Sequence, residues 1–428
     1  MIEITTEILW IIASVMIFSS GIYFSFKLKF IHLRFGKMFK ALKNEDKKSD
    51  SISAFQSLMI ALAGRIGVGS LAGIALGVYI GGPGVLFWIW LTSLLCASNE
   101  FVESTLSTIF RRKDSGNIYK GGPFYYISEG LKKKRLALTY AILLLIAYIG
   151  GFLTMQINTI TKSINTIVPV NPLIIGIIIA ILVGMTIIGG VKRIANTTGK
   201  LIPVVACFYI ILCSYIIITN LNLIPNVLAD VLNSALNFKT FGTGVLTTLL
   251  IGMQKGIFSS EVGLGTGSIA AASTATEKPE NNGLVQTLGI HIENLLIATI
   301  TVFVICISNY RTLVINDPNG IEITLFAFAE HFGSIGILFI IITISLFGLS
   351  TILTGYYYGE VSLKYIIKNT SKLDIILLKF ATIILLVIGS VISSNLLWRV
   401  VDIMVGLIAI INIYSIFKLR KIFSPKKE

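Results

Sequence analysis

Eleven apolar runs, each long enough to cross a membrane, dominate this chain. A membrane-spanning helix needs about 20 mostly apolar residues. Apolar residues make up 54% of the sequence and charged residues only 13%, whereas a soluble domain carries roughly 25% charged residues. We therefore predict an all-α polytopic membrane protein with about 11 transmembrane helices. The predicted spans are 8–26, 53–82, 84–110, 136–166, 172–190, 200–220, 241–272, 284–308, 335–362, 373–392 and 396–417.

The loops between these runs differ in charge. Most of the 35 lysines and arginines lie in alternate loops, whereas the opposite loops hold Lys239 and Arg311. Positively charged loops stay on the cytoplasmic side of a membrane. We therefore expect a cell-membrane protein with its N-terminus outside and its C-terminus in the cytoplasm. Contact between the basic loops and anionic lipid explains the net charge of +14 without a nucleic-acid partner.

The first basic segment, 27–50, carries apolar residues at helical spacing over 27–44. This pattern predicts an amphipathic helix that lies in the cytoplasmic interface of the membrane. A solvated basic loop is the alternative.

Two of the predicted spans contain glycine clusters in their middle. They read GRIGVGSLAG (64–73) and IFSSEVGLGTGSIAAAS (257–273), and each opens one of two groups of five helices. Five helices invert the second group relative to the first. We predict two inverted five-helix repeats with broken first helices. The divisions are an N-terminal transmembrane helix (1–26), the basic segment (27–50), the first repeat (51–222), the second repeat (241–420) and a cytoplasmic tail (421–428).

A broken helix frees backbone groups inside the membrane. Glycine tolerates an unwound turn and lets a ligand approach the backbone. The free N–H groups suit a carboxylate, and the free carbonyl groups suit a small cation such as Na⁺. The alternative is a ridge for close helix packing, because Gly69, Gly73, Gly77 and Gly81 recur every four residues. Both interpretations are compatible.

One ionisable residue stands beside each break. A charge in the bilayer centre needs a partner or water. We expect Arg65 and Glu261 to approach each other and to form a possible gate. Alternatively, each caps a half-helix or contacts water.

Ordered motifs across nearly the whole chain resemble those of the alanine or glycine:cation symporter family (sodium:alanine symporters). This family is similar to the leucine-transporter fold, with ten core helices in two inverted repeats. The motifs are GRIGVGSLAGIALGVYIGGPGVLFWIW (64–90), FVESTLSTIFRRK (101–113), GGPFYYISEGL (121–131), GGVKRIANTT (189–198), KGIFSSEVGLGTG (255–267), NGIEITLFAF (319–328), YYYGE (356–360) and LLWRVVDIMVGLIAIIN (396–412).

The resemblance implies Na⁺-coupled uptake of a small neutral amino acid by alternating access, with Na⁺ as the coupling ion and no cofactor. The candidate substrates are alanine, glycine and glutamine, and we expect a monomer. The implied substrate site comprises Gly67, Val68, Gly69, Ser70, Gln156, Thr351, Gly355, Ser259 and Ser260. The implied Na⁺ site comprises Ala63, Gly64, Gly67, Ser350 and Thr351.

The chain departs from the family pattern at two places. The family usually reads G-T-G-N where Gly67–Ser70 read G-V-G-S, so backbone contacts should dominate there. Gly355 replaces a larger Trp or Asn, which predicts a wider pocket that could accept glutamine.

Two rival functions stay open. An H⁺-coupled transporter of another small solute would use the same breaks. A membrane-embedded enzyme would need a motif such as H-E-x-x-H, which the sequence lacks. The cysteines and histidines also lack metal-ligand spacing, so we expect no transition-metal site.

Overall fold

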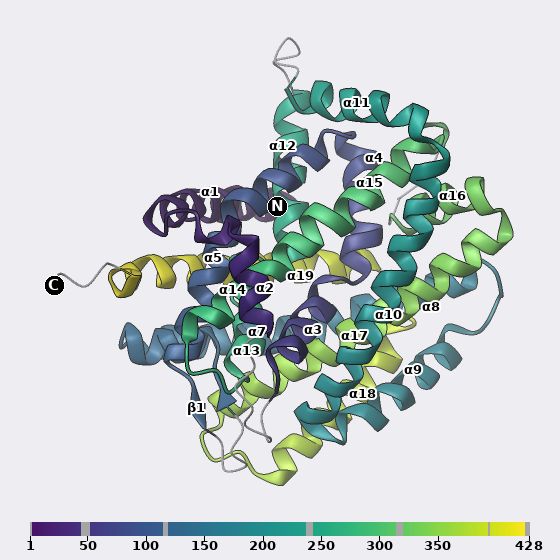
Figure 1. Cartoon of the computed structure of the whole chain (residues 1–428). Coiled ribbons are helices and arrows are strands. Elements are labelled where there is room, and N and C mark those ends of the chain that lie inside the picture. Colours follow the sequence, from purple (N-terminus) through teal and green to yellow (C-terminus); the bar gives the residue numbers. More distant parts are fainter. Residues whose placement is uncertain are drawn as a thin grey trace.

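The computed structural model describes residues 2–43, 52–113, 119–236, 243–313, 320–392 and 394–423, with the side chains of all but 2–5, 243–246 and 394–399. These residues form a bundle of helices (Figure 1). In the first half they are α1 (Ile2–Lys27), α2 (Phe35–Lys43), α3 (Ala54–Arg65), α4 (Ile74–Gly81), α5 (Val85–Ile109), α6 (Pro123–Tyr125), α7 (Lys134–Leu145), α8 (Leu153–Asn165), α9 (Pro172–Ile187), α10 (Gly190–Thr219) and α11 (Ile224–Leu236).

The second half of the bundle begins after α11. Its helices are α12 (Thr243–Ser260), α13 (Gly267–Ala272), α14 (Pro279–His291), α15 (Ala298–Ile307), α16 (Ile321–Phe332), α17 (Ser334–Ile366), α18 (Lys372–Gly389) and α19 (Ser394–Lys418). Four wider π-helical turns join or end helices: η2 (Gly69–Gly73), η3 (Tyr126–Gly130), η4 (Ile146–Phe152) and η7 (Ile292–Ile297).

Short 3₁₀ turns complete the helical elements in the described residues. They are η1 (Ile31–Leu33), η5 (Leu221–Leu223), η8 (Tyr310–Thr312) and η9 (Arg420–Phe423). The two-residue strands β1 (Arg112–Lys113) and β2 (Tyr119–Lys120) pair antiparallel, and they form the one sheet of the described part of the chain. The all-α prediction is therefore confirmed.

Seven helical segments of the described chain are long and apolar enough to cross a membrane, and an eighth qualifies if the bent pair α3 and η2–α4 counts as one span. The protein is thus a multi-pass membrane protein. Each of the eleven predicted spans coincides with a helix or a helix pair, although α9 has only 16 residues and α18 carries three charged residues. The count of eleven stays a prediction.

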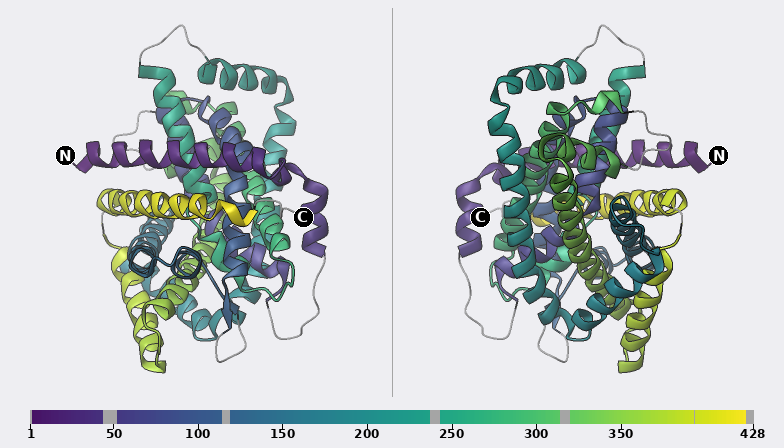
Figure 2. Two further views of the ribbon diagram at one scale, coloured as in Figure 1. Left: turned by 90° about the vertical axis from the view of Figure 1, so that its left-hand side faces the viewer. Right: turned by 90° about the vertical axis from the view of Figure 1, so that its right-hand side faces the viewer.

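Helix α5 is the central helix of the bundle. It contacts α14, α12, α1 and α13, and its second half is buried on all sides from Cys96 to Thr108. That stretch includes the carboxyl side chains of Glu100 and Glu103. On one flank of the bundle, α1 and α19 lie side by side and cover α5 (Figure 2).

Two helices occupy regions that the sequence analysis left between spans. Helix α11 lies across one end of the bundle (Figure 1) and buries Val227, Val231 and Ala235 at four-residue spacing. Helix α16 precedes α17 and packs against it and η2. Both are too short to span a membrane, so a search for long apolar runs passed over them.

The basic segment 27–50 contains a helix where one was predicted. Helix α2 buries Met38 and Ala41 against the bundle and packs along α14. Residues 44–50 of this segment lie outside the described residues. The placement of α2 at a membrane interface stays a prediction.

Candidate functional site

The first break separates α3 from the π-helical turn η2. Helix α3 begins at a capping box on Ser53 and ends at Arg65, and Ile66 leaves the helical conformation with φ −80° and ψ 85°. The chain bends by 51° between the two half-helices. The predicted interruption in GRIGVGSLAG is confirmed.

The second break separates α12 from α13. Glu261 adopts φ +57°, and Gly263 and Gly265 adopt φ +83° and +85°. Glycine tolerates these left-handed angles, which strain other residues. The backbone of the break is held from two sides, because Asn412 Nδ2 donates to Gly263 O (2.9 Å) and the Tyr140 hydroxyl donates to Leu264 O (2.5 Å). The predicted break in EVGLGTG is also confirmed.

The two breaks meet in the interior of the bundle. A β-carbon built on Gly64 would lie 3.3 Å from Glu261 Oε2, and one on Gly69 would lie 3.6 Å from the Phe258 ring. The backbone of the first break therefore faces the end of α12.

The structure brings Gln156 and Thr351 together at the first break. The Val68 N–H donates to Gln156 Oε1 at 3.2 Å. A β-carbon on Gly67 would lie 2.5 Å from Thr351 Oγ1 and 3.4 Å from Gln156 Oε1, so only glycine fits there without a shift. Side chains from α8 and α17 thus converge on the unwound residues.

Thr351 also contacts the end of α3. Its hydroxyl lies 2.8 Å from Ala63 O and 3.0 Å from Phe347 O, and it has one proton to donate. One turn further along α17, the Thr354 hydroxyl donates to Ile60 O at 3.0 Å. Helix α17 is therefore fastened to α3 at the carbonyl groups that precede the break.

Other predicted site residues make contacts within the helices. The Ser70 hydroxyl donates to Arg65 O (2.9 Å), and the Ser350 hydroxyl to Phe347 O (2.7 Å). The Ser260 hydroxyl donates to Gly256 O (2.5 Å), and that of Ser259 to Asn294 Oδ1 (3.3 Å). These four serines are buried, and each hydroxyl donates to another group of the protein.

The predicted widening at Gly355 is not present in this conformation. A β-carbon there would lie 2.7 Å from Leu153 Cδ1 and 3.4 Å from Tyr148 Cδ1. The Leu153 side chain occupies the space that a larger residue would fill, which the sequence could not reveal.

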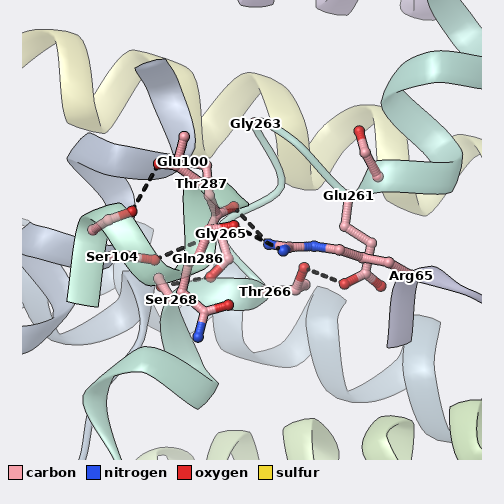
Figure 3. Close-up of polar contacts among 12 residues, drawn as sticks. Arg65, Glu100, Ser104, Glu261, Gly263, Gly265, Thr266, Ser268, Gln286 and Thr287 are labelled. Atoms are coloured by element: carbon pink, nitrogen blue, oxygen red, sulfur yellow. Dashed lines mark hydrogen bonds and ion pairs between the residues drawn. The ribbon is translucent and has the colours of Figure 1, made fainter. Parts of the chain in front are cut away.

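Arg65 pairs with Glu100, not with Glu261. Its Nη2 lies 3.1 Å from Glu100 Oε2, with both side chains fully buried, and its Nη1 donates to Gln286 O (3.0 Å). Figure 3 shows the Arg65 side chain extending past the second break toward Glu100 on α5. The expected Arg65–Glu261 pair is therefore wrong.

Two glycines explain why Arg65 reaches α5. A β-carbon on Gly267 would lie 2.3 Å from Arg65 Nη2, and one on Gly289 would lie 2.4 Å from Nη1. The guanidinium group passes between α13 and α14 through the space that these glycines leave. In the sequence, the presence of Glu100 inside the apolar run 84–110 could have indicated this partner.

Glu261 is held by hydroxyl groups instead. Thr266 Oγ1 donates to Glu261 Oε2 (2.9 Å), and the Tyr148 hydroxyl donates to Oε1. These bonds tie Glu261, at the start of the second break, to Thr266 at its end and to Tyr148 of η4. Figure 3 shows the bond from Thr266.

These features define the class of protein. Interrupted helices that face each other inside a multi-pass bundle are typical of secondary transporters. The model of the sodium:alanine symporter family matches residues 1–426. The chain belongs to this family, whose members are transporters and not enzymes.

The chain is similar to several named transporters. The chain is 35% identical to the probable sodium/glutamine symporter GlnT of Bacillus subtilis, over 100% of this chain and 90% of that protein. It is 32% identical to the amino-acid carrier protein AlsT of the same organism (97% and 88%). It is 31% identical to the sodium/alanine symporter AgcS of Methanococcus maripaludis (95% and 91%).

Proposed function

We propose that this protein carries a small neutral amino acid into the cell together with Na⁺, by alternating access. The observation that carries the proposal is the convergence of Gln156 and Thr351 on the unwound residues Gly67 and Val68. The family, and relatives named as sodium symporters of alanine or glutamine, support the same function.

The amino-acid site is proposed at the first break. Backbone N–H groups near Gly69 and Ser70 begin a helix and would bind the substrate carboxylate. Gln156 Oε1 has a second lone pair beyond the one that accepts from Val68, so it could accept from the substrate ammonium group. Ser259, Ser260 and Gly355 would bound the opposite side.

The Na⁺ site is proposed beside it. Sodium prefers oxygen ligands, and Ala63 O and Thr351 Oγ1 lie 2.8 Å apart. If the Thr351 hydroxyl donates its proton to Phe347 O, both Ala63 O and Thr351 Oγ1 have lone pairs free for the ion. Carbonyl groups of Gly64 and Gly67 and the hydroxyl of Ser350 complete the proposed ligands. Na⁺ would then fasten α17 to the break, and each ligand would raise the affinity of the other.

The buried Arg65–Glu100 pair is proposed as part of the cytoplasmic gate. It joins the end of α3 to α5 and is shielded from solvent. Opening toward the cytoplasm would separate these helices and hydrate both charges.

The proposed topology follows the distribution of charge. It comprises eleven spans in the cell membrane, an external N-terminus, a cytoplasmic C-terminus and two inverted repeats, 51–222 and 241–420. We propose a monomer as the working unit.

Uptake into proteoliposomes tests the function. We expect labelled alanine, glycine or glutamine to accumulate under an inward Na⁺ gradient, and to stop accumulating when choline replaces Na⁺. Accumulation driven only by a pH gradient would favour the H⁺-coupled alternative. Failure with both ions would refute the proposed substrates.

A further inference from the structure

A buried glutamate, Glu293, lies beside the first break and has no role in the sites described above. It belongs to the π-helical turn η7 and is 0% exposed. Neither of its carboxyl oxygens has a hydrogen-bond partner among the described residues, and none of the described ion pairs includes it. An ionised carboxylate without a partner is strongly disfavoured in such a place.

The neighbouring hydroxyl group indicates the protonation state. The Glu293 carboxyl and the Ser70 hydroxyl lie close enough for a side-chain interaction. Ser70 already donates its single proton to Arg65 O (2.9 Å), so its oxygen can only accept a second bond. A carboxylate also only accepts, and two acceptors repel each other. A protonated Glu293 would instead donate to Ser70, which satisfies both groups.

The charged and titratable groups around η7 do not supply another partner. Arg65 acts on Glu293 from a distance but is paired with Glu100, and Lys255 on α12 interacts with Asp402. The remaining groups that face Glu293 or lie on the elements packed against η7 are Tyr209 on α10, Cys96 and Glu103 on α5, Glu280 and His291 on α14, and Cys306 on α15.

We propose that Glu293 is a proton-binding site of the transport cycle, separate from the Na⁺ site. The proton binds the Glu293 carboxylate from the external side and leaves to the cytoplasm. When Glu293 loses it, the Ser70 hydroxyl must turn from Arg65 O to donate to the carboxylate, which alters the first break. This inference rests on the proposed symport function.

The position of η7 supports such coupling. The next residue, Asn294, accepts from Ser259 Oγ (3.3 Å) and donates to Gly256 O (3.2 Å) on α12. The same turn therefore contacts both broken helices. Single π-helical turns inside helices are frequent at functional sites.

The test measures proton movement and amino-acid uptake together. Proteoliposomes would contain a pH-sensitive dye, start at equal neutral pH inside and outside, and have their membrane potential clamped with K⁺ and valinomycin. We expect alanine uptake driven by Na⁺ to acidify the lumen. The Glu293→Gln variant, which mimics the protonated side chain, should lose this acidification while Na⁺-dependent uptake remains.

Two further variants separate the site from a general defect. Glu293→Asp keeps a carboxyl group and should keep the acidification, even if the glutamine variant proves inactive. Glu103→Gln alters another fully buried glutamate, on α5, and should also keep acidification in proportion to uptake. Alanine uptake without acidification in the unaltered protein would overturn the inference but leave the symport function intact. If Glu103→Gln lost the acidification and Glu293→Gln kept it, the assignment of the proton site to Glu293 would be overturned. Absence of uptake would instead count against the proposed function.

Discussion

At the residue scale, the most informative contact is the ion pair between Arg65 and Glu100. Both side chains are fully buried, where a single unpaired charge would be strongly destabilising. Removal of one partner from a buried ion pair costs about 3–5 kcal/mol, because the other charge stays unpaired. Replacement of both by apolar residues is often nearly neutral. A single variant of the pair should therefore be much less stable than the double variant.

We predict that Arg65→Met lowers the melting temperature of the purified protein strongly, and that adding Glu100→Leu restores most of the loss. Arg112→Gln breaks the exposed Arg112–Glu129 pair (2.9 Å) and provides the control. Exposed pairs contribute about 0–1 kcal/mol, so the control should melt almost normally. A double variant that is no more stable than Arg65→Met would show that the unpaired Glu100 charge is not the cause of the loss.

The sequence identified Arg65 as a buried charge but assigned it the wrong partner. Arg65 and Glu261 both flank glycine clusters, which made them a natural pair. The path to Glu100 depends on the absence of side chains at Gly267 and Gly289. Such a path exists only once α13 and α14 are packed, so sequence spacing could not reveal it.

At the element scale, the broken helices were predictable and the short helices were not. Glycine clusters mark both breaks, and the structure confirms both. Helices α11 and α16 lack the length that identifies a span. Their positions depend on contacts: a β-carbon on Gly84 would lie 2.5 Å from the Ala235 backbone nitrogen, so α11 rests directly on the turn before α5.

The candidate site shows the same division. Gln156 and Thr351 reach the first break as the resemblance implied, whereas Leu153 fills the space beside Gly355. The width of the space beside Gly355 depends on how the side chains of α8 and α17 pack. It cannot be predicted from the identity of residue 355 alone. Glu293 escaped notice because it lies within an apolar run with no glycine cluster beside it.

At the scale of the whole molecule, the orientation in the membrane is open to direct test. We predict that Arg311→Cys, in a background without the four native cysteines, reacts with a membrane-impermeant maleimide in intact cells. Arg311 is an exposed residue of η8, on the proposed external side. Lys368→Cys, on the proposed cytoplasmic side, should react only after permeabilisation. The reverse pattern would invert the proposed topology.

We propose that the first break binds Na⁺ and the amino acid together, with Thr351 as a ligand. The most direct test is the Na⁺ dependence of alanine binding to purified Thr351→Val, compared with Thr343→Val. Thr343 is a buried threonine of the same helix α17, and its hydroxyl donates to Phe339 O (2.8 Å) of that helix. We predict that Thr351→Val needs about tenfold more Na⁺ for half-maximal binding, equivalent to about 1.4 kcal/mol, while Thr343→Val behaves like the unaltered protein. An unchanged Na⁺ requirement in a folded Thr351→Val protein would show that Thr351 is not a Na⁺ ligand.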